Sequence, residues 1–163
     1  MNPSEISFAV DRMLGRLARM LRLLGYDTEY SPEMTTAQLQ AMARREDRKI
    51  LTRGQAAKRF PNLTHVFSVR SEHAPEQLRE VVSQFKLDVH SGLWTRCTLC
   101  NGVIERAEKA AVMGLVPAKV LEVYEEFYRC ARCAHIYWRG SHVARVARNL
   151  AAILGTGPYL PSQ

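Results

Sequence analysis

Four cysteines, the only ones in the chain, have the type and spacing most indicative of chemistry. They form two CxxC pairs separated by residues 101–129: Cys97, Cys100, Cys130 and Cys133. Two such pairs can close a tetrahedral shell of four thiolates around Zn²⁺. Because no coordination position stays open, the expected zinc is structural, not catalytic. Two disulfides or four unrelated thiols are the alternatives.

Asp11 is the second candidate. It follows an apolar run and precedes a helical pattern with one arginine-lined face. A carboxylate there could hold Mg²⁺ or Mn²⁺, and the arginines could bind phosphates. Alternatively, Asp11 caps the helix and the arginines face solvent, which the spacing alone favours. The arginines are Arg12, Arg16, Arg19 and Arg22.

Around Asp11, the pattern alternates between strand and helix over residues 6–94. This order predicts an α/β fold with a parallel sheet flanked by helices. Ligands bind beyond the carboxyl ends of such strands, where Asp11 and the Arg53–Gly54 turn both lie. The expected strands are 6–10, 27–30, 49–52 and 65–69, and three expected helices are 12–24, 55–60 and 75–85. The remaining helix opens after Thr35, with Leu39, Met42 and Ala43 facing inward. Thr35 and Gln38 predict a capping box at the second helix.

The pattern changes at Trp94, and residues 95–154 predict a zinc ribbon with helices. One helix should run from Pro117 to about Phe127, and a final one over Val143–Leu154. His135 and His142 could replace a zinc ligand, but four thiolates suffice. We therefore expect domains at 6–94 and 95–154, followed by a flexible tail at 155–163.

Composition narrows the class of protein. The 163 residues are 47% hydrophobic and 24% charged, as in ordinary globular proteins. No apolar run approaches the roughly 18 residues of a membrane span, and the N-terminus shows no secretion signal, so a cytoplasmic protein is expected. The net charge of +7 is a weak pointer to polyanions.

The sequence resembles the Mut7-C RNase domain family over about residues 6–150. The resemblance is carried by long motifs around Asp11, the third strand and both cysteine pairs, namely Phe8–Asp27, Ile50–Arg53, Arg96–Gly102, Pro117 and Phe127–His142.

This resemblance implies a PIN-like domain followed by a zinc ribbon, and metal-dependent ribonuclease activity. It also implies three acidic positions, which fall at Asp11, Thr36 and Gly54, so two of the three carboxylates are missing. Glu33 is the one plausible substitute, since Glu46 and Asp47 should lie at the far end of the second helix. With one carboxylate left, the affinity for Mg²⁺ or Mn²⁺ should fall steeply.

Three functions follow as hypotheses. The first is an RNA-binding protein with a degenerate nuclease site, using Arg12, Arg16, Arg19, Arg22 and Arg53. The second is an active Mg²⁺- or Mn²⁺-dependent ribonuclease with Asp11 and Glu33. The third is an adaptor whose ribbon binds a protein partner. The arginines retained beside lost carboxylates favour the first hypothesis, because phosphate binding needs no metal cluster.

Overall fold

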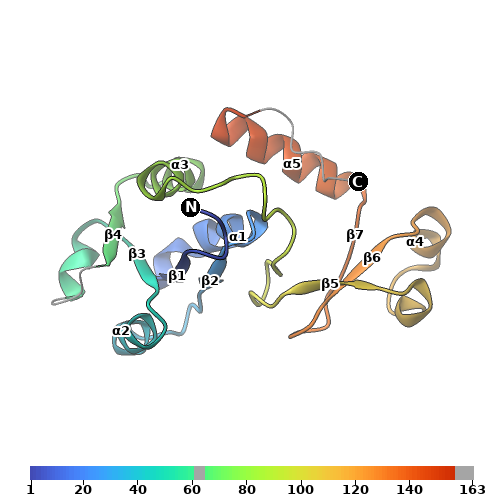
Figure 1. Ribbon diagram of the computed structural model, residues 1–163, viewed down its shortest axis with the longest axis horizontal. Helices are drawn as coiled ribbons and strands as arrows, with labels where there is room; N and C mark the ends of the chain where they lie inside the picture. The colour runs from blue at the N-terminus through green and yellow to red at the C-terminus, as the bar shows by residue number, and fades with distance from the viewer. Residues whose placement is uncertain (61–64, 157–163) are drawn as a thin grey trace. The chain divides into compact units, whose positions relative to one another are not determined.

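A computed structural model describes residues 1–60 and 65–156 of the chain (Figure 1). It divides into two compact units, Met1–Asn101 and Gly102–Gln163. The division thus lies after Asn101, seven residues beyond the boundary predicted after residue 94. Of the predicted tail, residues 157–163 lie outside the described residues.

The first unit contains a four-stranded parallel sheet with the order β2-β1-β3-β4. From β1 the chain adds β2 on one side and then crosses to add β3 on the other. The carboxyl ends of β1 and β3 therefore form the topological switch point at which such sheets bind ligands. Asp11 follows β1 at this point, and its backbone N–H donates to Leu51 of β3 at 2.9 Å. The strands are β1 (Ser7–Val10), β2 (Asp27–Glu29), β3 (Lys49–Arg53) and β4 (Val66–Val69).

Helices α1 (Gly15–Leu23) and α3 (Ala74–Phe85) lie on one side of the sheet and α2 (Thr36–Arg45) on the other (Figure 1). Successive strand residues point to opposite faces, so β1 serves both cores. Phe8 makes edge contacts with Tyr26 and Phe85, at centroid distances of 6.0 and 5.5 Å. Ala9 faces the second core, whose buried members are Ala9, Leu39, Ala43, Ile50 and Phe60.

Local signals set the ends of these helices. The capping box predicted at Thr35 and Gln38 is present, with each side chain bonded to the other residue's backbone N–H. After α1, Gly25 has a φ of +91°, and a Cβ there would lie 1.9 Å from the carbonyl oxygen of Gly92. Only glycine permits both this backbone and this close approach.

Two helix predictions in this unit need correction. The helix expected over 12–24 begins as a 3₁₀ helix (Arg12–Leu14), so Met13 turns outward and is exposed. The helix expected over 55–60 is a 3₁₀ helix as well, Gly54–Arg59. Both follow strand ends, where the chain turns sharply.

The second unit has a three-stranded antiparallel sheet of β5 (Ile104–Ala107), β6 (Phe127–Cys130) and β7 (Ile136–Trp138). Between β5 and β6 lie a 3₁₀ helix (Lys109–Val112) and α4 (Ala118–Val123). The helix predicted to reach Phe127 ends at Val123, because Phe127 is fully buried and pairs with Ala107 and Trp138. Helix α5 (Ser141–Leu154) follows β7.

The α/β class is therefore confirmed: a parallel sheet with helices, then an antiparallel sheet next to the cysteines. Within residues 1–60 and 65–156, the helices are too short or too polar to cross a membrane.

Candidate functional site

Asp11 is buried at the switch point of the parallel sheet, with 6% of its surface exposed. The Thr52 hydroxyl, at the end of β3, donates to Asp11 Oδ2 at 2.8 Å. In the described part of the chain, the Asp11 side chain makes no capping hydrogen bond to the turn that follows, so the N-cap interpretation is wrong for the carboxylate. The carboxylate faces β3 instead.

A cation from the chain itself already contacts this carboxylate. Arg59 Nη2 lies 2.6 Å from Asp11 Oδ2, in a charge-assisted hydrogen bond. Helix α2 holds the backbone at this position, because the Gln40 side-chain amide donates to the Arg59 carbonyl at 2.8 Å. The guanidinium therefore neutralises the charge that a divalent cation would otherwise use.

The other acidic positions implied by the resemblance carry no charge here. Thr36 is the first residue of α2, and Gly54 has a φ of +56° with open space around its missing Cβ. Glu33 is exposed in the loop before α2. Among the described residues, neither Asp11 nor Glu33 belongs to a group of three or more side chains that could hold a metal ion.

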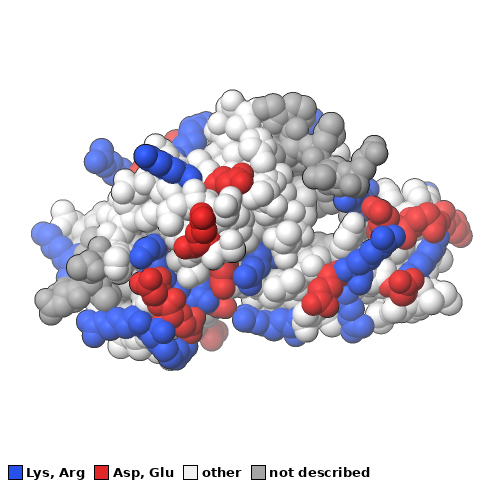
Figure 2. All heavy atoms as spheres, in the orientation of Figure 1, with Lys and Arg blue, Asp and Glu red and all other residues white. Residues whose placement is uncertain are grey.

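The arginines of the first helix divide into two kinds. Arg12, Arg16 and Arg19 are exposed, and within residues 1–60 and 65–156 their side chains form no ion pair. Arg53 is half-buried and lies 3.5 Å from Glu72. Figure 2 shows basic side chains interspersed with acidic ones on the visible face, so exposure and pairing identify candidates better than net charge does.

Arg22 corrects the prediction of a single arginine face. It is 2% exposed, and its guanidinium donates to the carbonyl oxygens of Thr28, Thr98 and Leu99 at 2.9, 3.2 and 3.0 Å. Each step of three residues shifts a side chain by about 60° around the helix, so Arg22 lies about 120° from Arg16. That rotation turns it into the protein, where carbonyl groups replace water. Arg22 is a structural residue and is not available to bind phosphate.

The four cysteines lie together, as their spacing predicts, in a group that could hold a metal ion. All four sulfur atoms lie within 4.8 Å of one another. Thiolates bound to one Zn²⁺ at roughly 2.3 Å lie about 3.8 Å apart, so the cluster is compatible with a four-thiolate zinc site.

The two CxxC turns have the same backbone geometry. The residue after each second cysteine, Asn101 or Ala134, has a positive φ, of 69° and 61°. Its N–H donates to the carbonyl oxygen of the first cysteine, Cys97 or Cys130, at 2.9 and 3.0 Å. Each turn therefore presents both sulfurs on one side.

Gly102 allows the second CxxC turn to come close to its backbone. A Cβ at Gly102 would lie 2.8 Å from the Cys130 sulfur and 2.7 Å from the Arg132 Cβ. Because real Cβ atoms do not come this close, any larger residue must displace the Cys130 turn. Gly102 thus keeps space beside the Cys130 sulfur.

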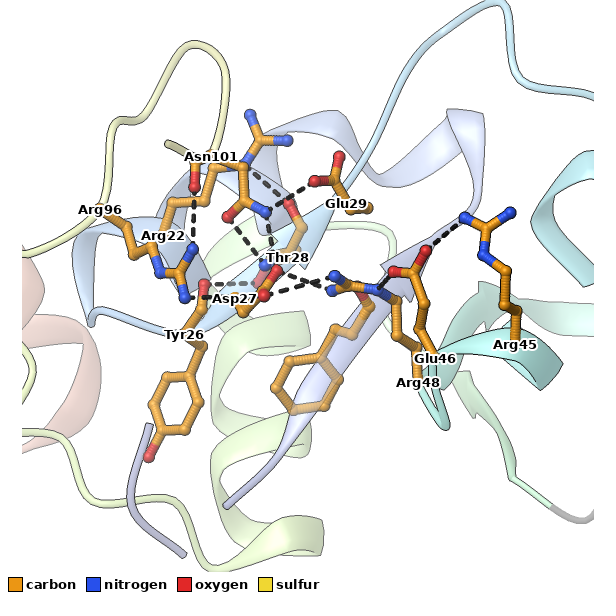
Figure 3. Close-up of polar contacts among 11 residues, drawn as sticks. Arg22, Tyr26, Asp27, Thr28, Glu29, Arg45, Glu46, Arg48, Arg96 and Asn101 are labelled. Atoms are coloured by element: carbon orange, nitrogen blue, oxygen red, sulfur yellow. Dashed lines mark hydrogen bonds and ion pairs between the residues drawn. The ribbon is translucent and has the colours of Figure 1, made fainter. Parts of the chain in front are cut away.

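The first CxxC turn is fixed to the edge strand β2 (Figure 3). The backbone N–H of Thr28 donates to Asn101 Oδ1 at 2.9 Å, and the carbonyl of Thr28 accepts from Arg22. The outward backbone groups of an edge strand can pair with another chain unless they are satisfied. Here two side chains satisfy both groups of Thr28.

The Asp27 carboxylate binds the polar and charged side chains around this contact. Arg48 Nη1 and Asn101 Nδ2 donate to Asp27 Oδ1 at 2.7 and 2.8 Å, and Arg96 lies 3.6 Å from Oδ2 (Figure 3). Burial raises the pKa of the Asp27 carboxyl, but hydrogen bonds from Arg48 and Asn101 and the charges of Arg48 and Arg96 outweigh that effect. The pKa of Asp27 therefore lies below its ordinary value.

The Mut7-C RNAse domain model matches residues 6–150, which include the Asp11 site and all four cysteines. The chain belongs to the Mut7-C RNAse domain family. The match extends over both compact units, and it confirms the resemblance seen in the motifs. A comparison with curated proteins finds no match.

Within this Mut7-C chain, the sequence did not reveal Arg59 or Asn101. Arg59 lies in the short helix expected over 55–60, and only the fold brings it to Asp11, 48 positions earlier. Asn101 carried one usable signal, its place after a CxxC, where asparagine tolerates a positive φ. Its contact with β2 needed the structure.

Proposed function

We propose that this member of the Mut7-C RNAse domain family binds RNA through its exposed arginines and no longer cleaves it. The observation that carries the proposal is the ion pair between Arg59 Nη2 and Asp11 Oδ2, at 2.6 Å. The family membership implies a nucleic-acid substrate. The ion pair supports a loss of metal chemistry at Asp11. It does not involve the exposed arginines proposed to bind RNA.

Hydrolysis in a two-metal site needs several carboxylates, which hold the ions that activate water and stabilise the leaving oxygen. One carboxylate, shared with a guanidinium and a hydroxyl, cannot supply that charge. Thr36 and Gly54, at the positions expected to be acidic, add none. Mg²⁺ or Mn²⁺ would therefore bind weakly, and no attacking water would be activated.

Phosphate binding depends on other groups. Arg12, Arg16 and Arg19 carry charges that no carboxylate neutralises within the described residues, and they follow the carboxyl end of β1. Phosphate contacts by such side chains release counterions and give affinity without a metal. Arg53 adds a fourth charge, partly neutralised by Glu72.

The binding test is a fluorescence-anisotropy titration of single-stranded RNA over a salt series. Replacing Arg16 and Arg19 together by alanine should weaken binding and reduce the slope of log K against log salt by about 1.4, the value for two phosphate contacts on a single strand. Arg44→Ala with Lys119→Ala removes the same charge elsewhere and should have a smaller effect. If the wild-type protein does not bind, the adaptor hypothesis replaces this one.

The cleavage test uses the same RNA with Mn²⁺. We expect no metal-dependent product from the wild-type protein, and no difference from Asp11→Asn. Metal-dependent cleavage that Asp11→Asn abolishes would establish the active ribonuclease instead. A variant with Thr36→Asp, Gly54→Asp and Arg59→Ala should gain Mn²⁺ binding by calorimetry, since open space surrounds Gly54 and aspartate tolerates a positive φ.

The cysteine cluster supports a structural Zn²⁺ in the same proposal. Cys97, Cys100, Cys130 and Cys133 would supply all four ligands, which leaves no position for water or substrate. Metal analysis should give one zinc per chain. Chelation should increase hydrogen exchange in residues 95–140, because the binding free energy of such a site is also folding free energy; unchanged exchange would argue against a structural metal.

A further inference from the structure

A row of three side chains crosses the antiparallel sheet of the second unit. Arg106 of β5 is opposite Tyr128 of β6, which is in turn opposite Tyr137 of β7. Residues directly opposite each other in antiparallel strands point to the same face. With strands roughly 4.8 Å apart, the row spans about 10 Å. His135 extends it, because its ring makes an edge contact with Tyr137 at 4.8 Å.

The opposite face of this sheet contains the core. Phe127 is fully buried there, opposite Ala107 and Trp138. By contrast, Arg106 and His135 are exposed, and Tyr128 and Tyr137 are half-buried. The row is therefore open to solvent, although Glu105 and Arg129 on the opposite face are exposed as well.

Arg106 is the one charged residue that the three strands place on the face of the row. The acidic residue of the three strands, Glu105, points to the opposite face, where Arg129 is its cross-strand partner. Arg106 thus stands on a face to which β5, β6 and β7 contribute no carboxylate. The positive charge of Arg106 suits a polyanion, and the two tyrosine rings suit planar groups. A nucleic acid offers both, whereas an acidic or an apolar peptide surface offers at most one.

We infer that the row Arg106–Tyr128–Tyr137 is a stacking surface for unpaired RNA bases. Exposed aromatic rings on a small sheet can stack bases of a single strand, while a guanidinium stacks on a base or binds a phosphate. This inference rests on the RNA binding proposed above and assigns a second contact site to it. The Tyr128 face also carries Cys130, so a metal bound by the cysteines would fix one end of the row.

The first test separates stacking by the aromatic rings from mere apolar bulk. Replacing Tyr128 and Tyr137 together by leucine removes both aromatic faces but keeps apolar bulk, whereas phenylalanine at both positions keeps the stacking. The leucine pair should weaken binding to single-stranded RNA roughly five- to a hundredfold, with an unchanged salt slope, while the phenylalanine pair stays near wild type. Binding to duplex RNA of the same sequence should change little, because its bases are not accessible.

Matched charge variants complete the design. Arg106→Gln should weaken binding, whereas Glu105→Gln, its neighbour on the other face, should not. Each variant is compared at equal zinc content and with an unchanged melting profile, so that misfolding is recognised. Wild-type affinity in the leucine pair, while Arg16→Ala with Arg19→Ala still weakens binding, would refute the stacking surface and leave the proposed function intact. No binding by the wild-type protein would refute both.

Discussion

The side chain of Asn101 accepts a hydrogen bond from the backbone N–H of Thr28 at 2.9 Å, so a residue of the first CxxC turn closes the edge of the parallel sheet. The same side chain donates to Asp27 and Glu29 at 2.8 and 3.1 Å. It is 1% exposed. All its polar atoms are therefore used inside the first unit.

Asn101→Gly should lower the free energy of unfolding by about 2 kcal/mol, because it leaves the buried Thr28 N–H without its acceptor. Glycine keeps the positive φ, so the loss reports the side chain alone. Ala134→Gly, at the matching position of the second turn, is the control and should be neutral or slightly stabilising. Equal effects of both changes in urea melts would show that the Thr28 contact contributes nothing.

Arg22 and Arg19 should differ sharply although both lie on α1. Arg22→Gln should destabilise the protein by about 3 kcal/mol, because three carbonyl oxygens lose a charged donor. Arg19→Gln, at an exposed position, should change stability by less than about 0.5 kcal/mol and should weaken RNA binding. Thermal melts and RNA titrations of the two variants check this division. A stable Arg22→Gln protein with weakened RNA binding would restore the single arginine face.

Asp27 should make stability depend on acid pH. Its pKa is lowered in the folded protein, so its contribution is complete above the unfolded value of about 3.9 and is lost as the pH falls through the lower folded value. Asp27→Asn should therefore be less stable than wild type at pH 7, and the difference should shrink below about pH 4. The measurement is urea unfolding at several pH values.

Asp47→Asn is the matched control, because Asp47 is exposed and its ion pair with Lys49 is long, at 3.7 Å. Its stability should follow wild type at every pH. The three proteins are compared at equal metal content at each pH, because Asp27 contacts Asn101 of the first CxxC turn. A constant difference between Asp27→Asn and wild type from pH 7 to pH 3 would contradict the prediction.

Gly102→Ala should weaken zinc binding roughly tenfold or more, since the added methyl group displaces the Cys130 turn. Competition with a chromophoric chelator measures the change. Gly114→Ala is the control from the same unit: its φ is +78° with nothing within 4 Å of the added Cβ, so it strains the backbone but spares the cysteines. Equal zinc affinity in both variants would mean that the Cys130 turn moves freely.

Features that depend on neighbouring residues in the chain could be predicted without the structure. The CxxC pairs, the capping box at Thr35 and the α/β alternation each depend on residues two to four positions apart. All three are present in the structure. The predicted helix ends were less accurate at Arg12 and Phe127. There, a tight turn after β1 and the burial of Phe127 in a sheet prevailed over the helical pattern.

The partners of the charged residues, by contrast, became known from the fold. Periodicity placed Arg22 with Arg12, Arg16 and Arg19, but the carbonyls of residues 98 and 99 bury it. No residue near Asp11 in the sequence predicts that Arg59 is its partner. Such pairs form when packing brings distant segments together. A charged side chain that loses its water then binds the polar group that has replaced it. Sequence spacing encodes turns and helix faces, whereas the partner of a buried charge is set by the whole fold.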